Sequence, residues 1–172
     1  MPAARDYAKG HIPGAVHAPW TVLKDADADG AFIENDPALA EASIRELGIS
    51  KGQRVLIYSD AVSTTAARQA WALEYFGHGE VYILDGGIDA WSSDSGAELS
   101  TDTPAVEPGD YEVALRKTVL ATTEDVERVV DGDVDAILFD ARSFSEYEGT
   151  DDRDNPRHGH VPNAIHYEWI NV

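Results

Sequence analysis

The chain contains no cysteine, and this absence excludes several kinds of chemistry for these residues. Disulfide bonds, thiolate nucleophiles and cysteine-held metal ions all need the missing side chain. No apolar run is long enough to cross a membrane, so no membrane partner is expected. The opening residues (MPAARDYAKG) hold no apolar stretch of the kind that directs export, and we therefore expect a cytoplasmic protein.

Positive charge is scarce. Lys and Arg together number 13 against 32 Asp and Glu, which gives a net charge of −19. Such a surface repels nucleic acid and anionic membranes, so neither is expected as a partner. One interpretation is that the acidic surface simply keeps the protein soluble. The other is that the protein is halophilic, because high salt screens the repulsion among its like charges. We favour the halophilic interpretation.

Hydrophobic residues make up 43% of the 172 positions, enough to fill a core. Spacing and composition predict a helix at 38–47, a buried strand at 55–58, a helix at 64–76 and another buried strand at 81–84. Asn35 or Asp36 can cap the first helix, Pro37 suits its first turn, and Gly48 can end it. Strand, helix and strand in this order indicate a βαβ unit and hence a parallel sheet covered by helices.

The second half of the chain changes character at residue 92. We predict a linker or long surface loop at 92–109, a helix at 124–130, a strand at 136–139 and a polar loop at 149–159. Thr122 or Thr123 can cap the helix.

An internal repeat is the strongest feature of the sequence. Residues 10–20 (GHIPGAVHAPW) recur as residues 159–169 (GHVPNAIHYEW), an offset of 149 residues. Six of the eleven positions are identical and two more exchange Ile with Val. An offset of this size corresponds to a domain and not to a solenoid repeat. Each copy predicts a turn at Pro and Gly or Asn, followed by a short buried segment.

These motifs resemble those of the rhodanese family. GHIPGA is similar to a motif near the start of rhodanese domains, DARSFSEYEG (140–149) to the stretch before it, and LDGGIDAW (84–91) to the domain's end. The resemblance implies an α/β fold with a rhodanese-like parallel sheet flanked by helices. It also implies one nearly complete domain plus the start of a second: 1–91 as a first domain without its opening strand, 92–109 as a linker, and 110–172 as the beginning of a second domain cut before its catalytic loop.

The position where the family carries its cysteine is occupied here by Ser59, directly after the predicted strand. The resemblance implies that a thiolate there takes sulfur from a donor and forms a persulfide. A serine hydroxyl forms no persulfide and is a poor nucleophile without a base. We therefore interpret the Ser59 loop as a degenerate loop of a scaffold domain, and the alternative is a functional serine. The spacing from Trp20 to Ser59, carried to Trp169, places a catalytic cysteine at about position 208 of a longer protein.

Arg142 is the candidate substrate-binding residue, because an arginine after the Asp140 strand contacts the anionic donor in the family. The alternative is a surface arginine paired with Glu146, four residues away. Asp140 is expected to hold the turn. The recurring histidines (His11, His17, His160 and His166) suggest a metal site together with His158. Each of them repeats because the fold repeats, with its ring nitrogens hydrogen-bonded to nearby backbone groups, and we therefore expect no metal and no cofactor.

The resemblance implies a sulfurtransferase that moves sulfane sulfur from thiosulfate or 3-mercaptopyruvate to cyanide or a thiol through a cysteine persulfide. The expected partners are a small anionic sulfur donor and its acceptor. Without cysteine, this chain is expected to be inactive, whereas the parent protein is expected to be an enzyme. The alternative is a noncatalytic rhodanese-like module that binds a partner protein or an anion. The strand at 136–140 can also complete the first domain's sheet, in cis or in a strand-swapped homodimer.

Overall fold

A computed structural model describes residues 4–25, 33–34, 36–60, 64–93 and 96–171 of the protein, as two compact units, Met1–Val119 and Leu120–Val172. The first unit contains, in chain order, α1 (Ala4–Tyr7), α2 (Pro37–Glu46), β1 (Val55–Ile57), α3 (Thr64–Tyr75), β2 (Val81–Ile83), α4 (Gly87–Ser93) and the 3-10 helix η1 (Lys117–Val119). The second contains α5 (Thr123–Val130), β3 (Phe139–Asp140), α6 (Phe144–Glu148), β4 (Ile165–His166) and the 3-10 helix η2 (Trp169–Asn171). No helix in the described part of the chain has both the length and the apolar character needed to cross a membrane.

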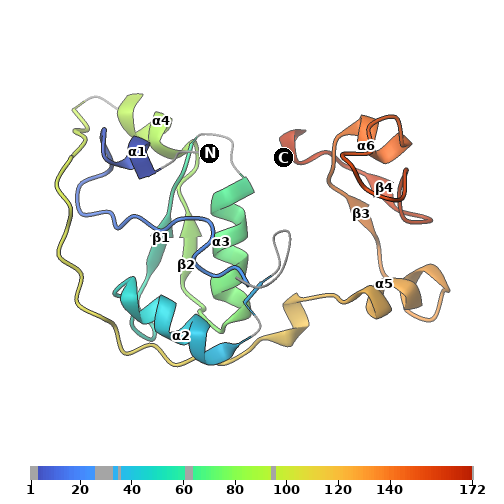
Figure 1. Ribbon diagram of the computed structural model, residues 1–172, viewed down its shortest axis with the longest axis horizontal. Helices are drawn as coiled ribbons and strands as arrows, with labels where there is room; N and C mark the ends of the chain where they lie inside the picture. The colour runs from blue at the N-terminus through green and yellow to red at the C-terminus, as the bar shows by residue number, and fades with distance from the viewer. Residues whose placement is uncertain (1–3, 26–32, 35, 61–63, 94–95, 172) are drawn as a thin grey trace. The chain divides into compact units, whose positions relative to one another are not determined.

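The first unit is built on a parallel βαβ arrangement, as the sequence predicts, but its two strands are not buried as predicted, since Leu56 is 66% and Ile83 48% exposed. Strands β1 and β2 pair in parallel, with Val55 opposite Val81 and Ile57 opposite Ile83, and α3 connects them along the sheet (Figure 1). The α/β fold class is thereby confirmed.

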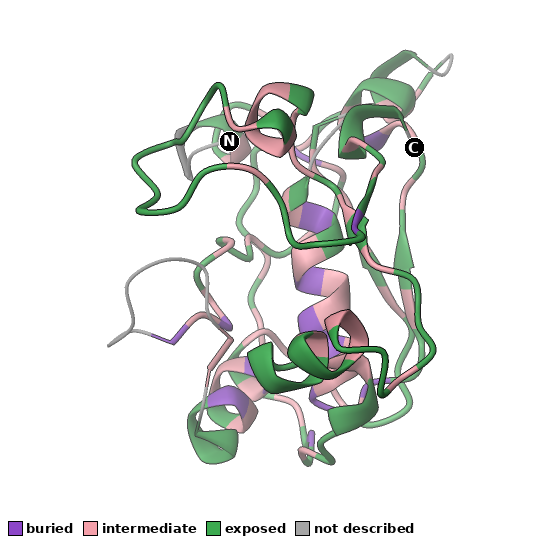
Figure 2. Ribbon diagram, turned by 90° about the vertical axis from the view of Figure 1, so that its right-hand side faces the viewer, coloured by how far each residue is buried: buried purple, intermediate pink, exposed green. Residues whose placement is uncertain are grey.

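The core of the first unit lies between the sheet and its helices. Its largest fully buried side chains belong to Tyr111, Phe76, Leu23, Ile44 and His11. Figure 2 shows buried positions along the long helix α3, where Ala66, Gln69, Ala72 and Leu73 are buried.

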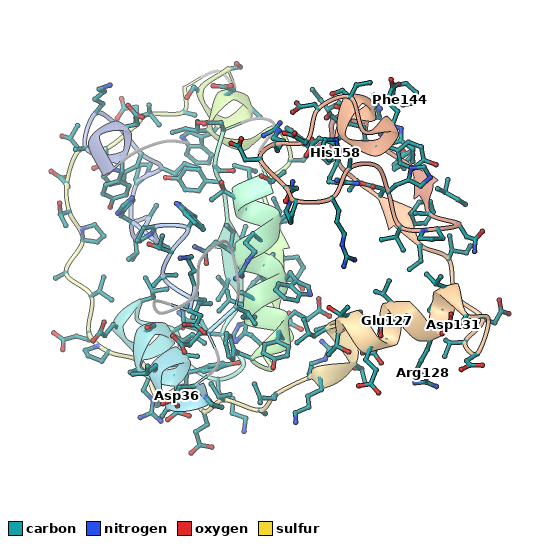
Figure 3. All side chains as sticks on the ribbon, turned by 45° about the vertical axis from the view of Figure 1, so that its right-hand side comes forward. Asp36, Glu127, Arg128, Asp131, Phe144 and His158 are labelled. Atoms are coloured by element: carbon teal, nitrogen blue, oxygen red, sulfur yellow. The ribbon has the colours of Figure 1, made fainter. Side chains whose placement is uncertain are left out.

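Local signals explain where α2 begins and ends. The Asp36 carboxylate accepts a hydrogen bond from the N–H of Ala38, 2.8 Å away, so Asp36 is the N-cap of the helix that starts at Pro37, and it is labelled in Figure 3. Asn35, the other predicted cap, lies outside the described residues. The helix ends before Gly48, whose φ of +77° is the left-handed conformation that glycine adopts most easily.

The segment after α4 belongs to the first unit. Residues 96–109 form no helix or strand, in line with the predicted surface loop, although residues 92–93 of that loop are the end of α4. Beyond it, Tyr111 is 2% exposed and its hydroxyl donates to the Phe76 carbonyl oxygen, 3.1 Å away. The second compact unit begins at Leu120 of the chain, whereas the sequence placed the opening of the second domain at residue 110.

The second unit has a short parallel sheet of its own. Phe139 of β3 lies opposite Ile165 of β4, and Asp140 lies opposite His166. The sequence predicted an apolar strand at 136–139, and this prediction is wrong in length, since β3 covers only Phe139–Asp140. The run is also largely exposed, with Ile137 69% and Phe139 64% exposed. The described helices of this unit contain no buried residue, so no helical layer covers the strand.

The repeated motif forms the same turn in both units. The N–H of Ala15 donates to the Ile12 carbonyl oxygen and that of Ala164 to the Val161 carbonyl oxygen, each at 3.0 Å. Gly14 and Asn163, the residues at matching positions of the repeat, both have positive φ, +82° and +65°. The predicted turns are confirmed. The segments that follow are not buried as predicted, since Val16 is 40% and Ile165 52% exposed.

Candidate functional site

Ser59 stands two residues after the end of β1, in the loop that leads to α3. Its carbonyl oxygen accepts a hydrogen bond from the N–H of Ile88 at 2.9 Å, which ties the loop to α4. Its hydroxyl lies 3.5 Å from the Asp60 carbonyl oxygen, the one hydrogen bond recorded for this group in the described part of the chain. Residues 61–63 lie outside the described residues.

The Asp-Gly-Gly sequence after β2 packs against this loop. A Cβ atom on Gly87 would lie 2.3 Å from the Ser59 carbonyl oxygen and 2.8 Å from that of Asp60, and the residue has a φ of +57°. Only glycine fits at this distance and in this conformation. The close packing fixes the end of β1 and the first residues of the loop, which is the region where the family carries its cysteine.

The chemistry available at Ser59 is limited. Among the described residues, no histidine or carboxylate side chain is hydrogen-bonded to its hydroxyl. A serine acts as a nucleophile when a neighbouring base accepts its proton. Such a base is not found among the described partners of the Ser59 hydroxyl, and the degenerate loop stays a prediction.

Tyr58, the residue before Ser59, connects β1 to the repeated motif of the first unit. Its hydroxyl oxygen accepts a hydrogen bond from the N–H of Ile12 at 3.0 Å, across 46 residues of sequence. Burial raises the pKa of the Tyr58 hydroxyl, so this group stays protonated at neutral pH.

Arg142 of the second unit is held firmly by Asp140. The Arg142 Nε atom donates to Asp140 Oδ1 at 2.9 Å, and Nη2 donates both to Asp140 Oδ2 and to the Gly159 carbonyl oxygen, 2.8 Å away. The backbone N–H of Arg142 donates to Asp140 Oδ1 at 3.1 Å, so Asp140 also holds the turn. Hydrogen bonding by Arg142 keeps the pKa of the Asp140 carboxyl below its usual value, and the same contact raises the pKa of Arg142.

The structural alternative for Arg142, an ion pair with Glu146, is wrong in its choice of partner. Arg142 pairs with Asp140, whereas Glu146 closes the capping box of α6 by accepting hydrogen bonds from the hydroxyl and N–H of Ser143. Glu146 also lies 3.7 Å from Nη2 of Arg153 in the polar loop. Figure 3 labels Phe144, on α6, and His158, in that loop.

Each copy of the repeat contains a stacked tyrosine and histidine that the sequence did not predict. The rings of Tyr7 and His11 stack with centroids 3.9 Å apart, and those of Tyr147 and His160 with centroids 3.7 Å apart. In both copies the histidine Nδ1 lies within 3.0 Å of the tyrosine's own carbonyl oxygen. A tyrosine precedes each motif, Tyr7 by 3 residues and Tyr147 by 12, and this recurrence is the signal that points to the arrangement.

The tyrosine hydroxyls complete the equivalence of the two copies. Tyr7 donates to the Ala15 carbonyl oxygen at 2.6 Å and Tyr147 to that of Ala164 at 3.0 Å. The predicted role of the repeated histidines, hydrogen bonding to nearby backbone, is thus confirmed for His11 and His160. Within the described ranges, no three His, Asp or Glu side chains gather as a metal site would require.

The fold and the repeated motifs define a rhodanese-like domain, and comparison with known proteins agrees. The rhodanese-like domain matches residues 2–94, so the chain belongs to the rhodanese family.

The chain is similar to curated and solved members of that family. It is 36% identical to a thiosulfate sulfurtransferase of Pseudomonas aeruginosa, over 98% of this chain and 61% of that protein. It is 33% identical to a thiosulfate sulfurtransferase of Corynebacterium glutamicum, over 95% of this chain and 56% of that protein. The crystal structure of SseA from Escherichia coli, described as a 3-mercaptopyruvate sulfotransferase, is similar with a TM-score of 0.84 and 28% identity, over 96% of this chain and 62% of that one. The chain thus spans less than two thirds of the length of these relatives.

Proposed function

We propose that the protein takes part in the transfer of sulfane sulfur from thiosulfate or 3-mercaptopyruvate to cyanide or to a thiol acceptor. The observation that carries this proposal is the 36% identity to a thiosulfate sulfurtransferase over 98% of the chain. Within the protein, we assign the first unit the role of a scaffold, since Ser59 stands where the nucleophile would be.

The proposed reaction has two steps. A cysteine thiolate attacks the outer sulfur of thiosulfate, a new S–S bond forms, the donor's S–S bond breaks, and sulfite leaves with the bonding electron pair. Cyanide then attacks the outer sulfur of the persulfide, and thiocyanate and the thiolate are released. The proposal needs a cysteine that these 172 residues do not contain, so we expect no turnover by this chain alone.

Arg142 is our candidate for binding the anionic donor. Asp140 and Gly159 engage its Nε and Nη2 atoms, whereas Nη1 has no recorded partner in the described part of the chain, and the side chain is 40% exposed. A guanidinium held in this way presents a fixed donor to a carboxylate or sulfonate-like oxygen.

The test uses the whole product of the coding region that contains these residues, and the 172-residue chain beside it. With thiosulfate and cyanide, we expect thiocyanate from the whole product and none from the chain. Replacing Arg142 with Gln should raise the KM for thiosulfate about tenfold, as for the loss of one charged hydrogen bond. Absence of turnover in the whole product contradicts the proposal and favours a noncatalytic binding module. Turnover by the chain alone contradicts the scaffold role of the first unit and the need for a cysteine.

A further inference from the structure

The backbone carbonyl group of Arg142 is hydrogen-bonded to a side chain and not to a neighbouring strand. In the second unit, the N–H of Trp169 donates to the carbonyl oxygen of Ala141 at 3.0 Å. One residue further along, the Arg142 carbonyl oxygen lies 2.9 Å from Nε2 of His166. A carbonyl oxygen can only accept, so Nε2 carries the hydrogen and donates it. The His166 side chain thus continues the hydrogen bonding that the backbone provides up to Ala141.

The ring of His166 is held in place by two aromatic side chains of α6. The ring centroid of Phe144, which is labelled in Figure 3, lies 5.4 Å away in an edge-to-face arrangement, and that of Tyr147 lies 5.0 Å away. The Tyr147 hydroxyl is itself fixed, because it donates to the Ala164 carbonyl oxygen at 3.0 Å. Such packing limits the orientations open to the imidazole and directs its Nε2–H to the Arg142 carbonyl.

This hydrogen bond completes a set that fixes the backbone on both sides of Arg142. The Arg142 N–H donates to Asp140 Oδ1 at 3.1 Å, and the N–H of the next residue, Ser143, donates to Glu146 Oε2 at 3.2 Å. His166 holds the carbonyl group of the same peptide unit as the Ser143 N–H. Because each residue has only two soft backbone dihedrals, holding both adjoining peptide planes fixes the direction in which the Arg142 side chain leaves the chain.

His166 contacts the backbone of Arg142 and leaves its guanidinium to other groups. Asp140 lies opposite His166 in the sheet and accepts from Nε of Arg142 at 2.9 Å, and the Gly159 carbonyl oxygen accepts from Nη2 at 2.8 Å. Hydrogen bonding by Arg142 is the main cause of the lowered pKa of Asp140, and the charge of His166 adds to it. Any effect of His166 on a ligand of Arg142 therefore passes through the Arg142 backbone.

We propose that His166 is a positioning residue for the anionic sulfur donor, because its hydrogen bond to the Arg142 carbonyl oxygen sets the place from which the guanidinium binds that donor. This role rests on the proposed function, in which Arg142 binds the donor. A binding group is only as well placed as the neighbours that hold it, and loosening those neighbours weakens binding. Histidine can donate from Nε2 in its neutral and in its protonated form, so the role does not depend on a change of charge.

The first test is steady-state kinetics of the whole product of the coding region with thiosulfate and cyanide. We expect His166→Ala to raise the KM for thiosulfate about fivefold, as for the loss of one hydrogen bond. The kcat should change little, because the ring takes no part in the sulfur transfer. His166→Gln should restore the KM, since the glutamine amide N–H can replace Nε2–H as a donor.

The matched control is His17→Ala, which removes the same ring from the first copy of the repeat. His17 has a tilted contact with Tyr7, at 5.1 Å between ring centroids, that resembles the contact of His166 with Tyr147. It should leave both the KM and the kcat unchanged, because the contact recorded for its ring is with Tyr7 and not with Arg142.

The second test needs no turnover and uses NMR of the 172-residue chain. Hydrogen exchange of the Arg142 Nε–H should become about fivefold faster in His166→Ala and return to nearly its original rate in His166→Gln. The amides of Tyr167 and Trp169, which donate to the carbonyl oxygens of residues 140 and 141, should keep their rates, because the sheet remains intact.

Three results would overturn the positioning role. The first is a KM that rises in Arg142→Gln but not in His166→Ala. The second is unchanged exchange of the Arg142 Nε–H in His166→Ala. The third is equally faster exchange of the Tyr167 and Trp169 amides, which would show a general loss of the sheet. Failure of the proposed function is distinct, since the whole product would then make no thiocyanate or Arg142→Gln would leave the KM unchanged, and the positioning role would fall with it.

Discussion

The Asp140 carboxylate accepts every one of its recorded hydrogen bonds from a single residue, Arg142, through the backbone N–H, Nε and Nη2. Arg142 lies two residues after Asp140, the last residue of β3. The chain turns at Ala141 between them and brings the Arg142 guanidinium back over the Asp140 carboxylate. The position of Arg142 is thus set by its own neighbour and by the Gly159 carbonyl oxygen.

Asp140→Asn should make the protein less stable at neutral pH, by about 1 kcal/mol for the loss of a partly exposed charged hydrogen bond. The pKa of Asp140 is lowered in the folded state, so the ionised carboxylate stabilises the fold at pH values above its unfolded pKa, near 4. As the pH falls from about 4 through the folded pKa, this contribution is lost. The stability difference between the original protein and the variant should therefore narrow in acid. Urea unfolding from pH 7 to pH 2 measures it.

The control is Asp133→Asn, which removes the same charge from an exposed residue whose side chain has no recorded partner in the described ranges. It should change stability little at any of these pH values. If the difference in unfolding free energy between the original protein and Asp140→Asn stays constant down to pH 2, the ionised carboxylate contributes nothing to stability.

The Tyr7–His11 and Tyr147–His160 stacks are contacts between single residues that the sequence did not predict. Ser59 and Arg142 could be placed because each lies two residues after the end of a strand. The stacks depend on ring orientations that composition and spacing do not determine, although the recurrence of the tyrosine before each motif pointed to equivalent positions. The unpaired Nε2 atom of His11 could not be predicted at all, since it depends on burial by the surrounding unit.

Among the elements, α5 is stabilised mainly at its ends, because none of its residues is buried. The Thr122 hydroxyl caps it by accepting from the N–H of Asp125, and the Asp125 carboxylate accepts from the N–H of Thr122. These hydrogen bonds lower the pKa of Asp125. Of the two predicted caps, Thr122 is confirmed, and Thr123 is the first residue of the helix.

Thr122→Ala should therefore loosen α5, with about fivefold faster hydrogen exchange of its amides, the effect expected when an N-cap is lost. Thr123→Ala is the matched control, because it removes the same groups one residue later and should leave the exchange rates nearly unchanged. Equal effects of the two substitutions would contradict the assignment of the cap.

Elements with local signals were predicted well, and those that depend on distant packing were not. Helices α2 and α3 agree with the sequence to within one residue at either end, because an aspartate and a proline mark the start of α2 and glycine follows both helices. The short helices α1, α4 and α6 were missed, since segments of this length have little periodicity. The apolar run 136–139 indicated a strand of four residues, yet only its end at Phe139 is a strand, because a strand forms only where β4 pairs with it.

For the whole molecule, the net charge of −19 sets the response to salt. We expect the free energy of unfolding to rise from low salt to molar NaCl, because screening reduces the repulsion among the acidic groups in the compact state. Thermal unfolding across this range measures the effect, with matched glucose solutions as an uncharged control. Equal stability at the two salt extremes would rule out the halophilic interpretation and leave solubility as the role of the charge.

A tyrosine stacks on a histidine in each unit, and the polar loop of the second unit lengthens the chain between these two residues. Tyr and His are separated by 4 residues in the first unit and by 13 in the second. Because the entropy of closing a loop grows only with the logarithm of its length, the longer connection costs about 1 kcal/mol more. The same stacked pair can therefore close over a long insertion as well as over a single helical turn, and the loop at 149–159 is a place where the chain can vary in length at little expense to its folding.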